Sequence, residues 1–325
     1  RGRVRNAPRE AGGRLGWPPP PPPPFGVGRA GGGGGGAAPA GGGGAHPRGA
    51  WGGPAGGGGG IWGGWVGGGG ASPACGKERG ALSEWLDGFS MAWGMFLAIP
   101  CPLRRWNEKA REKMLVCLPL VGLAVGGIWL GLYLLLRHAA IGGLYAFLMA
   151  ALPWLVTGFM HLDGYMDVCD AVLSRRELAT RQRILKDSHC GAFAVIGMVL
   201  LALCQWSVFL SGSADESLWG LLLIPVATRA CAGLAVLKLR PMGTSQYAAM
   251  GRHGGYAAAL AVLLAAAIAV PLVTDRSFAP LAAAAGYGLA VWYGFRQLDG
   301  MNGDISGFAL TLGELAGAAV WTLVR

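Results

Sequence analysis

Three aspartates in one short stretch have the spacing expected of a metal site. Asp163, Asp167 and Asp170 stand at positions i, i+4 and i+7. On a helix that advances about 100° per residue, their side chains lie within about 60° of one another on one face. Such close carboxylates repel each other unless a cation neutralises them, and hard oxygen ligands suit Mg²⁺ or Mn²⁺ together with a phosphorylated substrate. The stretch therefore predicts a Mg²⁺ site. The alternative is a helix cap at Asp163 followed by a solvated acidic face.

Charged residues inside apolar runs are further candidates. Arg229 lies within such a run, where a charged side chain is costly and usually functional. A phosphate or a carboxylate would satisfy its guanidinium, and Glu314 in the last apolar run is the predicted partner. Both are predicted substrate contacts, and snorkelling to the headgroups is the alternative for Arg229. His161 lies about 160° from Asp163 on the helical wheel, so it is predicted to contact substrate or to be an interfacial histidine, not to share the metal.

Two polar turns complete the set of candidates. Asp187 follows a basic stretch and is a candidate catalytic residue. In the turn Asn302-Gly303-Asp304, glycine lets backbone amides approach a phosphate, and Asp304 adds a metal ligand. Asn302 and Gly303 are therefore predicted substrate contacts. A plain connection between helices is the alternative for this turn.

Composition indicates the elements that position these residues. The chain has 325 residues, of which 53% are hydrophobic and only 14% are charged. A soluble domain has about 25% charged residues. We therefore expect an all-α, polytopic transmembrane helical bundle with about seven spans. The predicted spans are 114–136, 140–160, 191–211, 218–237, 256–274, 278–295 and 308–324, and segment 88–99 is predicted to be a short re-entrant or interfacial element.

Loop charges predict the orientation of the bundle. Lys and Arg crowd the segments before the first span and after the second, fourth and sixth, whereas the alternate connections hold only Arg137 and Arg276. Cytoplasmic loops carry such an excess. All the candidate turns fall on this side, so the sequence predicts a multi-pass protein with its active site facing the cytoplasm.

The first part of the chain differs sharply in composition. Residues 1–76 carry seven Arg and one Glu among long glycine and proline runs. Such a segment cannot bury enough apolar surface to offset chain entropy. We therefore expect a disordered Gly/Pro/Arg-rich tail at 1–80 and a membrane-embedded catalytic domain at 81–325. The net charge of +10 comes largely from this tail, and no nucleic-acid partner is predicted. The seven cysteines form no CxxC pair, so neither a zinc site nor a disulfide framework is indicated.

The motifs, taken together and in order, resemble one family. The segment from Phe159 to Asp170, the segment Asp187-Ser188-His189-Cys190-Gly191 and the closing Gly303-Asp304…Gly313-Glu314-Leu315 are similar to adenosylcobinamide-GDP ribazoletransferase, also called cobalamin synthase. The resemblance runs from about residue 89 to the C-terminus. The family usually has Arg where this chain has His189.

This resemblance implies a transferase of a prokaryotic cytoplasmic (inner) membrane. It would join adenosylcobinamide-GDP to α-ribazole, or to its 5′-phosphate, and release GMP. Mg²⁺ held by Asp163, Asp167 and Asp170 would assist, with one of these aspartates or Asp187 as the general base. The lipid bilayer is the expected surrounding, and association of identical subunits stays open. The alternatives from other classes are a CDP-alcohol phosphotransferase of phospholipid synthesis and a polytopic transporter.

Overall fold

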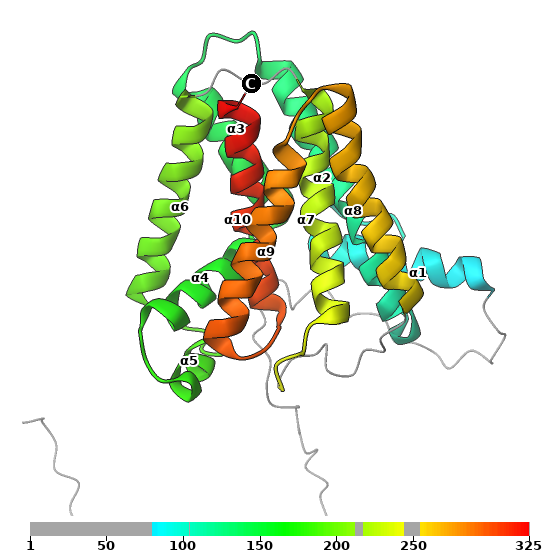
Figure 1. Cartoon of the computed structure of the whole chain (residues 1–325), viewed down its shortest axis with the longest axis vertical. Coiled ribbons are helices and arrows are strands. Elements are labelled where there is room, and N and C mark those ends of the chain that lie inside the picture. Colours follow the sequence, from blue (N-terminus) through cyan, green and yellow to red (C-terminus); the bar gives the residue numbers. More distant parts are fainter. Residues whose placement is uncertain (1–79, 104, 212–216, 244–253, 325) are drawn as a thin grey trace, which may run out of the picture. The chain divides into compact units, whose positions relative to one another are not determined.

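The computed structural model describes residues 80–103, 105–211, 217–243 and 254–324. All of them belong to the compact unit Ala55–Arg325. The predicted tail, and most of the loop 243–255, lie outside the described residues, so the predicted division at residue 80 stays a prediction. The described part is helical and contains no strand beyond one isolated bridge (Figure 1). Its elements are α1 (Ala81–Phe96), η2 (Glu108–Ala110), α2 (Arg111–Leu136), α3 (Gly143–Val156), α4 (Met160–Leu173), α5 (Leu178–Ile184), α6 (Ala192–Ser211), α7 (Leu218–Lys238), α8 (Gly254–Thr274), α9 (Ala279–Leu298) and α10 (Gly303–Leu323).

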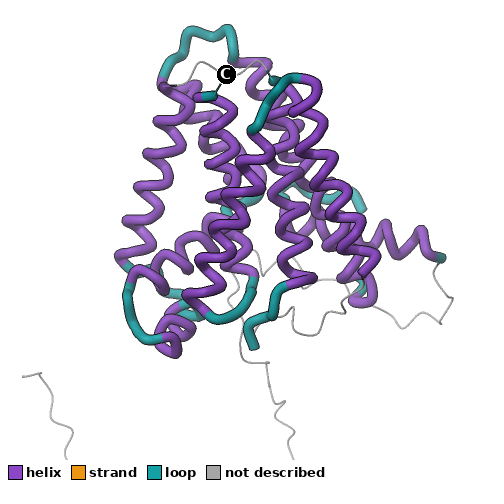
Figure 2. The backbone as a smooth tube through the Cα atoms, viewed as in Figure 1, coloured by secondary structure: helices purple, strands orange, loops and turns teal. Residues whose placement is uncertain are grey.

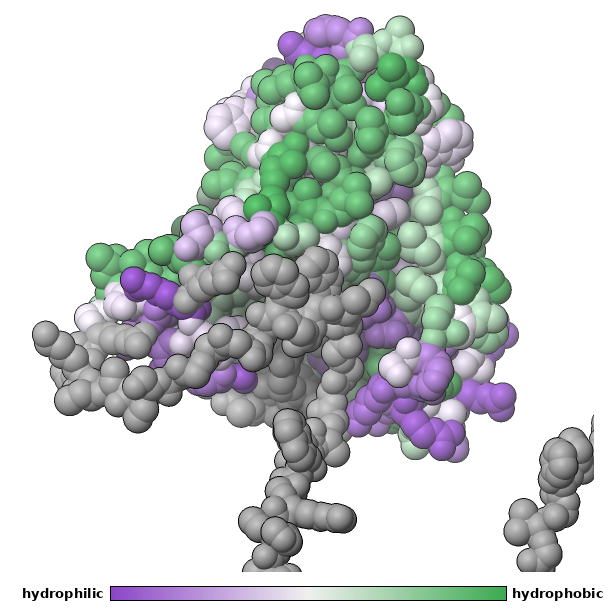
Figure 3. Space-filling model, turned by 180° about the vertical axis from the view of Figure 1, so that it is seen from behind, coloured by the Kyte–Doolittle hydropathy of each residue, from purple (hydrophilic) through white to green (hydrophobic). Residues whose placement is uncertain are grey.

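Five of the described helices are long and apolar enough to cross a membrane. They are η2 with α2 (Glu108–Leu136), α6, α7, α8 and α10, and the bent pair α3 and α4 raises the number to six. In their most apolar windows, only 28% of α6 and 22% of α8 is buried inside the protein. So much exposed apolar surface is stable in lipid and unstable in water. Figure 3 shows it as a broad apolar surface between more polar ends. The predicted polytopic helical class is confirmed.

Two predicted spans differ from the structure. Segment 278–295 forms α9, which is a 20-residue helix but is absent from the five candidate spans, because Arg296 and several glycines and aromatic residues lower its hydropathy. Segment 140–160 was expected to be one continuous span. It is instead broken, because Gly158 and Phe159 adopt φ of 61° and 62°, in the left-handed region where a helix cannot continue. The two pieces, α3 and α4, are bent by 94°.

The short element expected at 88–99 is the helix α1. It begins earlier than predicted, at Ala81, and in Figure 1 it lies across the direction of the long helices. One face packs against α2, and Leu82, Trp85 and Leu86 remain exposed on another. After α1 the chain turns inward, since the amide of Ala98 donates a 2.8 Å hydrogen bond to the carbonyl of Val156 at the end of α3. The segment after α1 thus contacts the break between α3 and α4.

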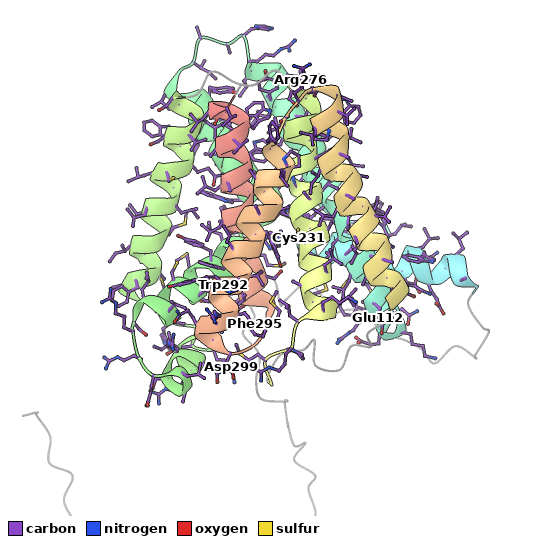
Figure 4. The ribbon with its side chains drawn as sticks, in the orientation of Figure 1. Glu112, Cys231, Arg276, Trp292, Phe295 and Asp299 are labelled. Atoms are coloured by element: carbon purple, nitrogen blue, oxygen red, sulfur yellow. The ribbon has the colours of Figure 1, made fainter. Side chains whose placement is uncertain are left out.

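The connections between helices gather at two ends (Figure 2). The basic end holds residues 174–191, 239–242 and 299–302, and the opposite end holds residues 137–142 and 275–278. Figure 4 marks Asp299 and Glu112 toward the basic end and Arg276 at the opposite end. Hydrogen bonds join the three segments of the basic end: Gln182 Nε2 donates to the carbonyl of Leu298 at 2.8 Å, and the amide of Met242 donates to the carbonyl of Met301 at 2.8 Å. The polar loops that the sequence assigned to one side therefore do lie together.

An aromatic cluster fills the bundle near the opposite end. Trp129 and Trp321 have no exposed surface, and Tyr133 and Phe209 pack against them with ring centroids 5.1–6.4 Å apart. The indole N–H of Trp321 donates to the carbonyl of Ser217, and that of Trp129 donates to the carbonyl of Met149. These ring contacts join α2, α6 and α10.

Candidate active site

The helix α4 carries the three predicted aspartates on one face. Asp163 is exposed and Asp167 and Asp170 are half-buried, whereas Leu162, Val168 and other residues of the opposite side are buried. The spacing i, i+4 and i+7 therefore gives one acidic face, as predicted from the helical period. Because the chain breaks just before α4, this face lies on a separate short helix and not in a loop beyond a span.

The start of α10 adds a fourth carboxylate, that of Asp304. A Cβ atom on Gly164 would lie only 2.9 Å from the Cα and carbonyl oxygen of Asp304, and one on Gly307 would lie 3.0 Å from the carbonyl oxygen of His161. Side chains at either glycine would force α4 and α10 apart. Asn302 caps α10, since its Oδ1 accepts from the amide of Ile305 at 3.0 Å, and its Nδ2 donates to Asp304 at 2.6 Å. The turn 302–304 is thus an ordered helix start that faces α4.

The four carboxylates form an uncompensated negative group, which we call the acidic face: Asp163, Asp167, Asp170 and Asp304. The carboxylate of Asp167 is repelled by the other three. In the described ranges, none of the four makes an ion pair. Nor do three His, Cys, Asp or Glu side chains there already converge on one metal position. Mg²⁺ is usually held by one or two carboxylates, with water and substrate oxygens as the other ligands, so this donor set fits that ion.

The loop after α5 contacts the acidic face through Gly191. A Cβ atom on Gly191 would overlap both carboxylate oxygens of Asp170, so the backbone of Gly191 lies close against this side chain, and a larger residue would require the carboxylate to move. Asp187 precedes Gly191 in the same loop, but its own carboxylate points to His189, with 2.6 Å between Asp187 Oδ1 and His189 Nδ1. Hydrogen bonds from His189 hold the pKa of Asp187 below its usual value. The structure therefore brings the loop to the acidic face and pairs Asp187 with a histidine.

A second polar group lies buried between α4, α7 and α10. Arg229 and Glu314 are 2% and 5% exposed and form the predicted ion pair. Arg229 is therefore not snorkelling toward the headgroups. The hydroxyl of Thr311 donates to the carbonyl of His161 at 3.3 Å, and the ring of His161 stacks on Phe96 with centroids 6.1 Å apart. We call Arg229, Glu314 and His161 the buried polar group. It lies on the side of α4 away from the acidic face, as the wheel predicted for His161.

One buried charge was missed in the sequence. Asp87 on α1 has no exposed surface, accepts a 3.0 Å hydrogen bond from Asn107 and lies 3.8 Å from Arg105. The hydroxyl of Ser90 accepts from the amide of Arg105 at 3.1 Å in the same region. These contacts fix the chain between α1 and α2. Asp87 is a single aspartate in a helix too short to span a membrane, so neither hydropathy nor spacing marked it as buried. Its partner Asn107 lies in a polar stretch before the first predicted span.

Comparison with known proteins identifies the family. The family model described as Cobalamin-5-phosphate synthase matches residues 88–322, from α1 to the end of α10. The chain belongs to the cobalamin-5-phosphate synthase family. The match includes the acidic face, the loop at Asp187 and the buried polar group. The resemblance stated from the sequence is thereby confirmed, and with it the prediction of an enzyme of cobalamin synthesis.

Curated relatives agree with this assignment. The adenosylcobinamide-GDP ribazoletransferase of Clostridium perfringens (strain 13 / Type A) is 35% identical over 236 residues, which are 70% of this chain and 94% of the relative. That of Clostridium botulinum (strain Alaska E43 / Type E3) is 31% identical over 245 residues, 73% of this chain and 97% of the relative. No solved structure matches the chain. These members of the cobalamin-5-phosphate synthase family come from bacteria, and the apolar helices make the present chain a multi-pass membrane member of it.

Proposed function

We propose that the chain transfers the cobinamide phosphoryl group of adenosylcobinamide-GDP to a hydroxyl of α-ribazole or of its 5′-phosphate. The new phosphorus–oxygen bond forms as the bond to GMP breaks, so the products are adenosylcobalamin, or its 5′-phosphate, and GMP. The relatives are named for this transfer. The observation that carries the proposal is the acidic face, where two helices present four carboxylates without a cationic partner in the described chain.

The residues of the acidic face have distinct roles in this proposal. Asp163, Asp167, Asp170 and Asp304 are the candidate ligands of Mg²⁺, which would neutralise charge on the transferring phosphoryl group and on the leaving GMP. Asn302 and Gly303 begin α10, whose N-terminal amides favour an anionic group. Asp187 lies in the adjoining loop and is a candidate catalytic residue. Arg229, Glu314 and His161 are too buried to reach a substrate at the acidic face in this arrangement, so we propose that they support α4 and α10 from behind.

The two alternative functions make different predictions. A CDP-alcohol phosphotransferase would share a carboxylate metal site and the membrane, but it would use a CDP-linked donor. A transporter would move substrate without releasing a nucleotide. The names of the curated relatives favour transfer from the GDP-linked donor over both.

Product analysis tests the proposal directly. Purified protein in lipid, given adenosylcobinamide-GDP, α-ribazole and Mg²⁺, should release GMP and form adenosylcobalamin in equal amounts. The Asp163→Asn variant is the matched negative control, and CDP-linked donors are the comparison substrates. Absence of GMP release by folded wild-type protein, with either α-ribazole or its 5′-phosphate, would refute the proposed reaction.

We propose in addition that the basic end faces the cytoplasm, where nucleotide substrates are available. The concentration of Lys and Arg at that end supports this orientation. Cysteines introduced at His138, at the opposite end, should react with an impermeant reagent added outside cells, and cysteines at Glu177, at the basic end, should not. The reverse labelling pattern would contradict the orientation.

A further inference from the structure

The helix α1 is apolar on its outer side. Leu82, Trp85 and Leu86 are exposed, and Leu82 has 75% of its surface accessible. Together with Phe89 and Trp93, which follow one and two turns later, they lie within about 100° of one another around the helix. We call these five residues the apolar stripe. In a soluble protein such a stripe faces the core, whereas here its first three members face outward.

The inner side of α1 is the polar one. Asp87 has no exposed surface and accepts a 3.0 Å hydrogen bond from Asn107. Ser90 is 4% exposed and accepts a hydrogen bond from the amide of Arg105. In water, folding turns polar side chains outward and apolar ones inward. The reverse arrangement of α1 is favourable where its outer side meets an apolar phase, and lipid is such a phase.

The length and direction of α1 suit the surface of a bilayer. The helix has 16 residues, about 24 Å at 1.5 Å per residue, and it is not one of the candidate spans. It lies across the direction of the long helices (Figure 1) and toward the same end as Glu112 (Figure 4). An amphipathic helix of this kind is stable in the plane between headgroups and acyl chains.

Two exposed tryptophans, each beside a cation, support this position. Lys113 lies over the ring of Trp85, with Nζ 5.8 Å from the ring centroid, and Trp85 packs edge-on against Tyr256 of α8 at 6.0 Å. On α9, Arg296 lies over Trp292, with Cζ 5.1 Å from the centroid, and Figure 4 shows Trp292 in the part of α9 nearer the basic end. Tryptophans and snorkelling cations are typical of the boundary between membrane and water. These contacts indicate that the boundary at the basic end lies near α1.

The end of α1 contacts the helix that carries the acidic face. The ring of Phe96, the last residue of α1, stacks on His161 of α4 with centroids 6.1 Å apart. Two residues after Phe96, the amide of Ala98 donates a 2.8 Å hydrogen bond to the carbonyl of Val156, at the end of α3. Asp163, the first carboxylate of the acidic face, follows His161 by two residues. A displacement of α1 would therefore disturb the start of α4.

We infer that α1 binds the membrane surface at the basic end through its apolar stripe, and that this contact holds the start of α4 in place. The partner is the boundary layer of the bilayer and not a second copy of the chain, because the lipid around the candidate spans reaches α1 without any further component. The contact with lipid is independent of the proposed reaction, whereas its effect on turnover rests on the proposed function.

Photo-crosslinking tests the contact with lipid. The full chain with p-benzoylphenylalanine at Leu82, reconstituted into phosphatidylcholine bilayers, should form adducts with lipid on illumination. The same group at Leu200, an exposed apolar residue of α6, is the positive control, and at Glu177, an exposed residue of the connection before α5, it is the negative control. Adducts at Leu82 with a second copy of the chain, or no lipid adduct there while Leu200 reacts, would overturn the inference.

A double substitution tests the coupling to α4. Leu82→Gln with Leu86→Gln weakens the apolar stripe and leaves the residues that contact α2 and α4 unchanged. In bilayers, amide hydrogen exchange over residues 81–96 should rise about tenfold, because less apolar surface is buried in lipid. GMP release should fall several-fold at normal membrane content. Leu82→Met with Leu86→Met should retain both wild-type properties, and so should Ser83→Gln, which lies on α1 outside the stripe.

The outcomes separate the parts of the inference. Unchanged exchange over residues 81–96 in the double Gln variant would overturn the contact with lipid. Raised exchange with unchanged turnover would overturn the coupling to α4. Adducts and exchange are measured without substrate, so a wild-type protein that releases no GMP would defeat the proposed function and leave the contact with lipid standing.

Discussion

The acidic face and the buried polar group use charge in opposite ways, although one short helix separates them. In the buried polar group, Arg229 and Glu314 neutralise each other and are almost entirely enclosed. In the acidic face, four carboxylates of one sign lie exposed or half-buried and repel one another. The buried pair neutralises its own charges within the protein. The repulsion among the four carboxylates is relieved when a cation binds. The first is suited to holding helices together, and the second to binding and chemistry.

The largest expected effect is on stability, at Glu314. Replacing Glu314 with Ala leaves the charge of Arg229 buried and unpaired, which destabilises proteins by about 3–5 kcal/mol. The thermal unfolding temperature and the amount of folded protein in the membrane should both drop. The double change Arg229→Met with Glu314→Leu should recover most of the loss, since an apolar pair of similar size removes both charges. If the single variant is as stable as wild type, the pair does not hold α7 to α10.

Neutralising the acidic face should give the opposite pattern. Asp163→Asn and Asp167→Asn each remove a negative charge from the proposed metal site, and turnover should fall about 100-fold or more. Stability without metal should stay the same or rise, because repulsion at Asp167 is relieved. Asp170→Asn should be less severe. Glu177→Gln, an exposed acidic change outside the face, is the matched control and should be nearly silent. Normal turnover in the first two variants at limiting Mg²⁺ would remove the metal site.

Metal binding should stabilise the acidic face without the aid of substrate. A ligand that binds only the folded state at 100 times its Kd adds about 2.7 kcal/mol. Adding Mg²⁺ to metal-free protein should therefore raise the unfolding temperature, and a chelator should reverse the change. The shift should be absent in a protein that carries both Asp163→Asn and Asp167→Asn, and it should persist in His138→Gln. An equal shift in all three proteins would point to a non-specific salt effect.

The smallest effect is expected from the tail. Its composition offers no periodic apolar face, so deletion of residues 1–76 should change neither the stability supplied by the buried polar group nor the turnover at the acidic face. Membrane content and GMP release of the shortened chain are the measurements. A large loss in either would assign the tail a role that its sequence does not indicate.

Helical periodicity and charge were sufficient to predict much of this arrangement. The acidic face of α4 and the pairing of Arg229 with Glu314 both follow from local spacing or from the expense of a lone charge in lipid. The break at Gly158 and Phe159 was missed, because the prediction of this span used hydropathy, which is high over most of residues 140–160 and does not report backbone dihedrals. The pairing of α4 with α10 depends on Gly164 and Gly307, and a single glycine in a helix gives no signal of what approaches it. The pairing of Asp187 with His189 likewise depends on the path of the loop.

The break before α4 also bears on ion permeability. At about 1.5 Å per residue, the 14 residues of α3 cover about 21 Å, which is less than the roughly 30 Å of a bilayer core. Water and ions can therefore approach the acidic face from the basic end, partway into the membrane. Beyond it lie the enclosed Arg229–Glu314 pair and then the packed rings of Trp129, Trp321 and Phe209. We expect this packing to hinder the passage of ions, so a membrane containing this protein should keep its proton and sodium gradients during turnover.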